Sequence, residues 1–232
     1  MKLTYYTVAY TFLFASAASG QSVIVGIPSS DITKKGHISM AHESQFGSTA
    51  ATPRYWNSFT FGTYGVGKNT ELAASMYGLS SPNSGNRALG IGFKTSLPMG
   101  ETLGPLTEPR FTFGQMTPIS FDGKGIGFWG YTSVSARLPG TRTRITAGPS
   151  WGTRQIFGRN VWSAMVGVEQ PLTKKLTFLS DWMSGTHDLA AGVAAIGWQV
   201  NPKFILISGY KFSNNARSGP NAVIVELAWE IH

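Results

Sequence analysis

The amino-acid sequence predicts an all-β fold, an antiparallel transmembrane β-barrel of about 12 strands preceded by a signal peptide. Three observations support this. Charged residues make up only 13% of the 232 residues, whereas soluble domains carry about 25%. After the N-terminus, no apolar run reaches the roughly 18 residues that a membrane helix needs. Most of the chain instead alternates apolar and polar residues, as strands between lipid and water do.

The N-terminus has the organisation of a secretory signal peptide. Lys2 is followed by an uncharged, apolar-leaning stretch and then by small residues, Ala15-Ser16-Ala17-Ala18-Ser19-Gly20. We expect residues 1–20 to be the signal peptide, with cleavage near Ala18 or Gly20. The alternative, a membrane anchor, needs a longer apolar stretch. Residues 21–35 are then expected to form a periplasmic N-terminal segment, and residues 36–232 the barrel.

Twelve segments have strand character. In chain order they span residues 36–47, 56–66, 70–78, 87–97, 107–117, 125–138, 142–151, 160–170, 175–184, 187–199, 203–213 and 221–231. The last segment alternates most clearly, with Val223, Val225 and Leu227 on one face and two glutamates on the other. An even strand number returns both chain ends to the periplasmic side.

The other segments repeat this alternation. Their apolar faces carry, in chain order, Ile38, Met40 and Phe46; Leu89, Ile91 and Phe93; Phe111 and Phe113; Val134; Leu176, Phe178 and Trp182; and Phe204, Leu206, Tyr210 and Phe212. The segments are joined alternately by short turns and by longer polar loops. This asymmetry is typical of outer-membrane barrels, whose short turns are periplasmic. The stretch Pro98–Pro109 is expected to be a longer connection on the turn side.

Seven tryptophans lie mostly near the expected strand ends, where barrels carry interfacial aromatic girdles. The main alternative fold is a soluble β-sandwich of similar strand number. Such a sandwich would carry more charge on its outer faces, so the low charge favours the barrel.

The composition excludes several functions. The chain has no cysteine, hence no disulfide framework and no thiolate nucleophile or metal ligand. The net charge is +8, but Lys and Arg are scattered, and the longest basic runs are the pairs Lys34-Lys35 and Lys174-Lys175. A nucleic-acid partner is therefore not expected. Contacts of loops with anionic lipopolysaccharide, or a lumen that favours anions, explain the charge better.

Three hairpin units resemble one known family: Thr63-Tyr64-Gly65-Val66-Gly67-Lys68-Asn69-Thr70-Glu71-Leu72, Gln170-Pro171-Leu172-Thr173-Lys174-Lys175-Leu176 and Gln199-Val200-Asn201-Pro202-Lys203-Phe204. From Gly36 to Ile231 the pattern resembles the transporter-like outer-membrane proteins grouped under the phenol-degradation meta-pathway label. The resemblance implies passage of small solutes, aromatic ones among them. Such barrels commonly end in an aromatic residue that the barrel-assembly machinery recognises, whereas this chain ends Trp229-Glu230-Ile231-His232.

Two groups of residues resemble parts of the catalytic sites of barrel enzymes. His187-Asp188, with Asp181 nearby, resembles the His–Asp pairs of barrel proteases, and His42 with Ser44 could serve an outward-facing phospholipase. Neither set forms a complete triad. His37 and His42 face opposite sides of a strand, so they cannot share a metal. The glycine-rich stretches 90–92 and 123–127 lack the strand–loop–helix context of a phosphate site. We therefore expect no enzyme activity, cofactor or metal.

Charged residues on the inward-facing positions form the candidate site. They are Glu43, Glu71, Lys94, Arg110, Arg137, Arg142, Arg144, Glu169, Asp181, Lys211, Glu226 and Glu230. A charge on the lipid face costs about 2–4 kcal/mol at the membrane midplane, so placement in the lumen is favoured. The set forms either a salt-bridged plug that stabilises a narrow barrel or a charged constriction that selects solutes.

The sequence therefore predicts a non-enzymatic outer-membrane pore or small-solute transporter of a Gram-negative bacterium, with passive passage through a charge-lined lumen. The expected partners are outer-membrane lipid and lipopolysaccharide, the assembly machinery and small organic solutes. Two alternatives remain open. One is a closed structural or adhesion barrel whose external loops bind a partner, and the other is an outer-membrane hydrolase.

Overall fold

The computed structural model describes residues 23–47, 56–79, 87–187 and 189–231. The expected signal peptide, Asp188 and His232 lie outside the described residues. The described chain is almost entirely β-sheet, with a four-residue helix α1 (Arg154–Phe157) and a 3-10 turn at Ala216–Ser218 in two of the loops. None of the described helices is long and apolar enough to cross a membrane.

Thirteen strands are found among the described residues. They are β1 (Ile38–Gly47), β2 (Trp56–Gly67), β3 (Thr70–Tyr77), β4 (Ala88–Pro98), β5 (Thr102–Leu103), β6 (Leu106–Ser120), β7 (Trp129–Arg137), β8 (Arg144–Gly152), β9 (Trp162–Pro171), β10 (Leu176–Met183), β11 (Ala191–Asn201), β12 (Phe204–Ser213) and β13 (Ala222–Ile231). The two-residue β5 pairs only with the start of β6. The remaining twelve form the wall, so the predicted strand number is confirmed.

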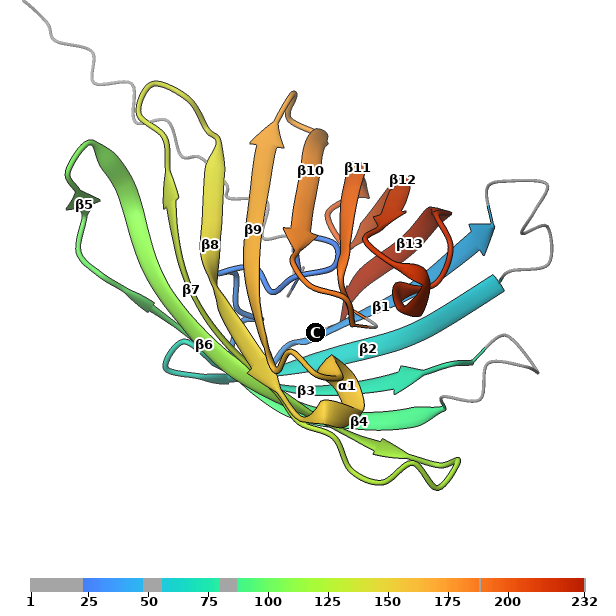
Figure 1. The fold of residues 1–232 in the computed structure, drawn as a ribbon. Coiled ribbons are helices and arrows are strands. Elements are labelled where there is room, and N and C mark those ends of the chain that lie inside the picture. Colours follow the sequence, from blue (N-terminus) through green and yellow to red (C-terminus); the bar gives the residue numbers. More distant parts are fainter. Residues whose placement is uncertain (1–22, 48–55, 80–86, 188, 232) are drawn as a thin grey trace, which may run out of the picture.

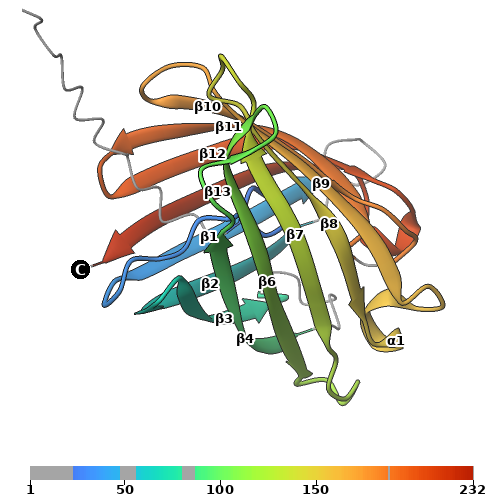
Figure 2. The same ribbon diagram turned by 90° about the vertical axis from the view of Figure 1, so that its left-hand side faces the viewer.

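The sheet closes into a barrel (Figures 1 and 2). Each wall strand is antiparallel to its neighbours, and the first and last strands pair over ten residues, from Ile38 opposite Ile231 to Gly47 opposite Ala222. On the other side of the short β5 hairpin, β4 pairs directly with β6 from Ala88 opposite Ser120 to Pro98 opposite Arg110. Closure leaves no edge strand, so the backbone N–H and C=O groups of the wall are hydrogen-bonded within the sheet.

The two ends of the barrel differ. At one end, here called the turn end, short connections such as 68–69, 172–175 and 202–203 join the strands. At the other, here called the loop end, the connections are longer, among them 121–128, 153–161 and 214–221. The stretch expected to be a longer connection around 98–109 is largely the hairpin of β5 and β6, because Thr102 and Leu103 pair with Thr107 and Leu106.

Burial alternates along the strands as the sequence predicts. In β13 the side chains of Val223, Val225 and Leu227 are exposed on the outer face, whereas Ile224 and Glu226 are buried inside. The tryptophans lie close to the strand ends. Trp56, Trp129, Trp151, Trp162 and Trp182 lie at the loop end, and Trp198 and Trp229 lie at the turn end. All except Trp129, which packs inward against Tyr131, fit two interfacial girdles around an apolar belt.

The sequence predicts residues 21–35 as a periplasmic N-terminal segment that precedes the barrel. In the structure most of residues 23–35 lie within the ring of strands, and Lys34 and Lys35 are exposed at its turn end (Figure 1). Ile24, Val25 and Ile27 are buried against the inner wall. The physical reason is that twelve strands enclose more space than their own side chains fill, and this apolar segment occupies the remainder.

We predict that Val225→Arg destabilises the barrel by about 2–4 kcal/mol, because Val225 lies on the outer face near the middle of β13 and the substitution exposes a charge to lipid. Equilibrium unfolding in urea with phospholipid vesicles measures this change. Val225→Leu is the matched control and should remain within about 1 kcal/mol of the wild type. Equal stability of the two variants would mean that this face does not contact lipid.

Candidate functional site

The barrel interior is occupied by the N-terminal segment, defined here as residues 23–35. Its tip is a tight turn in which Val23 pairs with Pro28 and the N–H of Ile24 donates to the carbonyl of Ile27 over 2.8 Å. The chain then returns to the turn end, where Lys35 pairs with Gly65 of β2 before β1 begins. Figure 1 shows this loop in blue within the ring of strands. The interior is therefore filled by a segment that is continuous with the wall only through β1.

Asp181 of β10 anchors the tip. Its Oδ2 accepts three successive backbone N–H groups, from Val25 at 2.8 Å, Gly26 at 2.7 Å and Ile27 at 3.3 Å. The carboxylate is buried, and three donors on one ionised oxygen form strong charge-assisted bonds. Without this acceptor the N–H groups of Val25 and Ile27 would be buried without this partner. Asp181 is thus the residue that holds the tip in the lumen.

Glu71 of β3 forms a second anchor near the turn end. Its Oε2 accepts the backbone N–H of Thr33 at 2.7 Å, and its Oε1 lies 3.2 Å from Nζ of Lys94 on β4. Glu71 and Lys94 are both fully buried, and they are direct register neighbours in the sheet. The hydroxyls of Thr33 and Thr63 on β2 share a hydrogen bond of 2.6 Å. The buried Glu71–Lys94 ion pair therefore holds the C-terminal part of the segment at Thr33.

A third anchor joins the segment to the opposite wall. Nη1 of Arg144 on β8 lies 2.9 Å from Oδ1 of Asp31 and 3.4 Å from Oε2 of Glu169 on β9. Arg144 is a register neighbour of Glu169, so strand pairing sets the position of this ion pair. The three anchors come from β3, β8 and β10, which lie in different parts of the wall. The segment is consequently held across the lumen and not against one side only.

Two glycines shape the wall for this segment. A Cβ at Gly65 would collide with the carbonyl oxygens of Thr33 and Lys34, and a Cβ at Gly167 of β9 would collide with Ile24. Both are wall positions where the absence of a side chain lets the segment approach the sheet. The wall and the segment are therefore complementary in shape as well as in hydrogen bonding.

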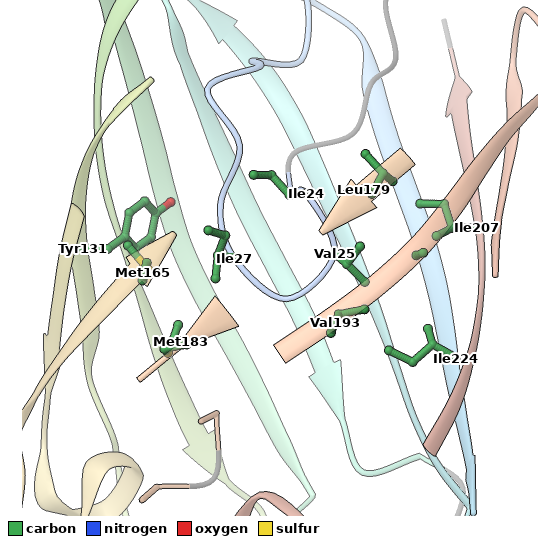
Figure 3. Packing of buried hydrophobic residues seen from close by; sticks show 11 residues of the cluster. Ile24, Val25, Ile27, Tyr131, Met165, Leu179, Met183, Val193, Ile207 and Ile224 are labelled. Atoms are coloured by element: carbon green, nitrogen blue, oxygen red, sulfur yellow. The ribbon is translucent and has the colours of Figure 1, made fainter. Parts of the chain in front are cut away.

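Apolar side chains complete the packing around the tip. Figure 3 shows Ile24, Val25 and Ile27 surrounded by residues from the strands. The buried cluster also includes Tyr131, Met165, Leu179, Met183, Val193, Ala195, Ile207 and Ile224. These residues belong to six strands, so the tip lies at the centre of the buried cluster. The N-terminal segment therefore contributes directly to the core of the barrel.

A second group of charges lies toward the loop end. Glu43 of β1 and Glu226 of β13 are register neighbours, and both are buried. Nε2 of Gln45 donates to Glu43 at 2.6 Å, while Nζ of Lys211 on β12 donates to Oε1 of Gln45 at 3.1 Å and to the carbonyl of Ser218 at 2.6 Å. Neither carboxylate oxygen of Glu226 has a hydrogen-bond partner among the described residues. Two adjacent buried carboxyl groups and one ammonium therefore lie together in this part of the interior.

The remaining sequence-predicted residues lie near the turn-end rim. Arg110 donates from Nε and Nη2 to the side chain and backbone oxygens of Ser96. Arg137 pairs with exposed Glu108 at 2.7 Å, and Nδ1 of His37 lies 2.6 Å from Oε1 of Glu230. Arg142 was expected at the start of a strand, but it lies exposed in the turn between β7 and β8, because β8 begins two residues later. Of the twelve residues, only Arg142 is outside the wall strands.

A cavity of about 400 Å³ opens at the foot of the N-terminal segment. It is lined on one side by the segment and on the other by the turn between β2 and β3 and by Arg110. The lining residues are Ser30, Asp31, Ile32, Thr33, Lys34, Lys35, Gly67, Lys68, Asn69 and Arg110.

The structure places the described members of the two sequence-predicted catalytic sets as follows, and Asp188 lies outside the described residues. His42 lies on the outer face of β1, and its Nδ1 meets Oγ1 of Thr60 at 2.8 Å, a hydroxyl in place of the orienting carboxylate or amide of a triad. Oγ of Ser44 is 3.4 Å from Nε2 of His42. His187 is buried against Phe157, and Asp181 is occupied by the N-terminal segment. Within the described residues, no three His, Asp or Glu side chains are grouped to hold a metal ion.

Sequence reasoning missed the N-terminal segment as part of the site. The signal that could have revealed it is the apolar run Val23-Ile24-Val25-Gly26-Ile27, which is unsuited to a segment surrounded by water. The inward charges were found by alternation, but their partners were not. Thr33 is 38 residues from Glu71, and Gly26 is 155 residues from Asp181.

Solved structures with the same fold are outer-membrane barrel porins. The KdgM porin in complex with disordered oligogalacturonate has a TM-score of 0.60 at 8% identity, with 84% of this chain and 99% of that chain covered. A second structure of the KdgM porin has a TM-score of 0.59 at 8% identity, with 84% of this chain and 99% of that chain covered. The NanC porin has a TM-score of 0.57 at 7% identity, covering 82% and 97%. The chain therefore has the porin fold. At identities this low, the likeness concerns the fold alone.

Sequence comparison adds no family. No family model matches the chain, and no curated protein matches it. The resemblance to the phenol-degradation meta-pathway proteins therefore stays a prediction.

We predict that Asp181→Ala releases the tip of the N-terminal segment. The substitution removes an acceptor of three N–H groups, and one hydrogen bond to a charged group contributes about 1.5–3 kcal/mol. Amide hydrogen exchange at Val25, Gly26 and Ile27 should therefore accelerate by about tenfold or more. Asp122→Ala, which removes an exposed loop carboxylate bonded to the Arg87 N–H, is the control. Unchanged exchange at the three tip amides would refute the anchoring role of Asp181.

Proposed function

We propose that this protein is a passive channel for small solutes in the outer membrane of a Gram-negative bacterium, and that its lumen is closed when the N-terminal segment is seated. The porin fold supports the first part. The observation that carries the proposal is that a peptide segment occupies the lumen and packs there against the wall's inward side chains. A barrel with only a structural role can close its interior with larger inward side chains, whereas a separate segment can move.

Displacement of the segment is mechanically simple. The segment is joined to the wall covalently at its C-terminal end, through Gly36 and His37 into β1. Its other attachments are the three anchors, the Thr33–Thr63 hydrogen bond, the pairing of Lys35 with Gly65, and the apolar packing of the tip. Movement out of the lumen breaks none of the hydrogen bonds between wall strands. The wall can therefore stay closed toward lipid while the lumen opens toward water.

The charged wall residues then set the filter. Once the segment leaves, Asp181, Glu71 with Lys94, and Arg144 with Glu169 face the water-filled passage. Rings of charged side chains in a low-dielectric wall select solutes by charge, and no chemical step is required. This gives a non-enzymatic function in which the same carboxylates hold the segment when the channel is closed and line the passage when it is open.

In this proposal lipopolysaccharide and outer-membrane lipid surround the apolar belt, and the assembly machinery inserts the chain. The competing proposal is a closed barrel that binds partners through its loops. The two differ in one measurable respect, because a closed barrel conducts no ions in any state of the segment.

We predict that conductance in planar lipid bilayers depends on the seating of the N-terminal segment. Thr33→Cys with Thr63→Cys places two thiols where the hydroxyls are 2.6 Å apart, which suits a disulfide in a chain without native cysteine. Oxidation should suppress open events, because the tether removes the unseated state, and dithiothreitol should restore them. Asp181→Ala should open more often than the wild type.

The matched control is Thr70→Cys with Thr95→Cys, whose hydroxyls are 2.9 Å apart but belong to the neighbouring wall strands β3 and β4. Its conductance should not respond to oxidation. If neither the wild type nor Asp181→Ala shows channel events or solute flux, the channel proposal is wrong. Equal conductance of the oxidised and reduced Thr33/Thr63 variant would instead reject the segment as the closing element.

A further inference from the structure

The cavity at the foot of the N-terminal segment is formed jointly by two parts of the molecule. Residues 30–35 of the segment line one side, and residues 67–69 of the β2–β3 turn line the other, together with Arg110 of β6. Its volume of about 400 Å³ is enough for a small organic molecule. A molecule bound there would contact the segment and the wall at the same time.

The lining is strongly cationic. Lys34, Lys35, Lys68 and Arg110 contribute four positive charges, and Asp31 contributes the one carboxylate. Asp31 is already paired with Arg144 at 2.9 Å, which adds a further positive charge behind it. Among the described residues, Lys34, Lys35 and Lys68 belong to no ion pair.

One of these cations is held in a defined position, and another extends from a conformationally restricted turn. Arg110 donates from Nε to Oγ of Ser96 at 2.9 Å and from Nη2 to the Ser96 carbonyl at 2.7 Å, so its guanidinium is fixed at the cavity edge. A fixed guanidinium is suited to carboxylate and phosphate groups. Lys68 lies in a turn in which Gly67, Lys68 and Asn69 all have positive φ, at 91°, 51° and 62°. That tight turn sets the direction from which the Lys68 side chain reaches the cavity.

We propose that this cavity binds a small polyanion, with two or more carboxylate or phosphate groups, and that the bound polyanion holds the N-terminal segment in the lumen. Several negative charges are needed because exposed lysines each contribute little and are screened by salt. The ligand contacts both the segment and the wall, so it binds the seated state better than the unseated state. By linkage it shifts the channel toward closure.

The binding half of this proposal stands on the cavity and its charges, and the closure half rests on the proposed function. The two halves are therefore tested by different measurements. Binding is measured on the full chain in neutral detergent, where conductance plays no part. Closure is measured in planar bilayers.

Binding is tested by isothermal titration calorimetry at low ionic strength with two probes, citrate and pyrophosphate. Lys34→Gln with Lys35→Gln should weaken binding of both by about fivefold to tenfold, because two of four lining cations are removed. Lys174→Gln with Lys175→Gln is the matched control, since this exposed pair lies in the β9–β10 turn at the same end of the barrel but outside the cavity. The control loses the same net charge and should bind like the wild type.

Three results would overturn the site. They are no binding of either probe to the wild type, equal weakening by both lysine pairs, and binding that does not weaken as salt is added. The middle result would mean that overall charge, not the cavity, attracts anions.

The phosphate could be free or part of a lipid headgroup, and a further titration separates these sources. Citrate is titrated into protein in micelles containing cardiolipin, a lipid whose headgroup carries two phosphates. If the lipid lowers the citrate affinity of the wild type but not that of the Lys34→Gln with Lys35→Gln variant, the result supports the site with a headgroup as its occupant. Unchanged citrate affinity would support a free polyanion.

Closure is tested by adding citrate to both chambers of a planar bilayer that contains the protein. Open events of the wild type and of the Lys174/Lys175 variant should become rarer, and those of the Lys34/Lys35 variant should change much less. Citrate binding without any effect on open events would overturn the closure half. If no protein conducts with or without citrate, the channel itself fails, while the calorimetric result still decides the site.

Discussion

The structure depends on closure of the sheet, because hydrocarbon offers no partner for an exposed backbone N–H or C=O group. The ten paired residues of β1 and β13 satisfy this demand where the two ends of the chain meet. The consequences extend to the interior. Closure brings the start of β1 to the turn-end rim, so the residues that precede it begin at the mouth of the lumen. The N-terminal segment therefore needs only a short path to enter the barrel.

What the closed wall leaves open is the interior. Twelve tilted strands enclose a space wider than their side chains fill, and filling it with peptide introduces backbone groups that also need partners. The inward carboxylates meet this second demand. Asp181 accepts three N–H groups of the tip and Glu71 accepts that of Thr33, while Lys94 balances the charge of Glu71. Buried ions at these positions are thus explained by the segment, as their contacts are largely with it or with the ions that hold it.

The same arrangement links packing to function. The apolar tip is part of the core, so the seated segment stabilises the folded interior, yet it is no part of the hydrogen-bonded wall. A barrel built in this way can lose its plug without losing its continuity toward lipid. The cationic cavity lies where the segment leaves the lumen, between its residues 30–35 and the β2–β3 turn. In our proposal a ligand at that point stabilises the seated segment, because it contacts the residues through which the segment joins β1.

The alternation of residues by itself determined the wall. Alternation predicts a strand over 221–231, and the structure has β13 over Ala222–Ile231. Glu71, Lys94 and Asp181 are buried in the interior. Alternation has this power because a period of two assigns each residue to lipid or to the interior, and lipid tolerates few errors. It carries no information on what fills the interior, since that depends on contacts between residues distant in the chain. Val25 and Asp181 are 156 residues apart, and only the closed barrel brings them to 2.8 Å. The tertiary structure alone therefore decided that residues 23–35 lie in the lumen and not outside it.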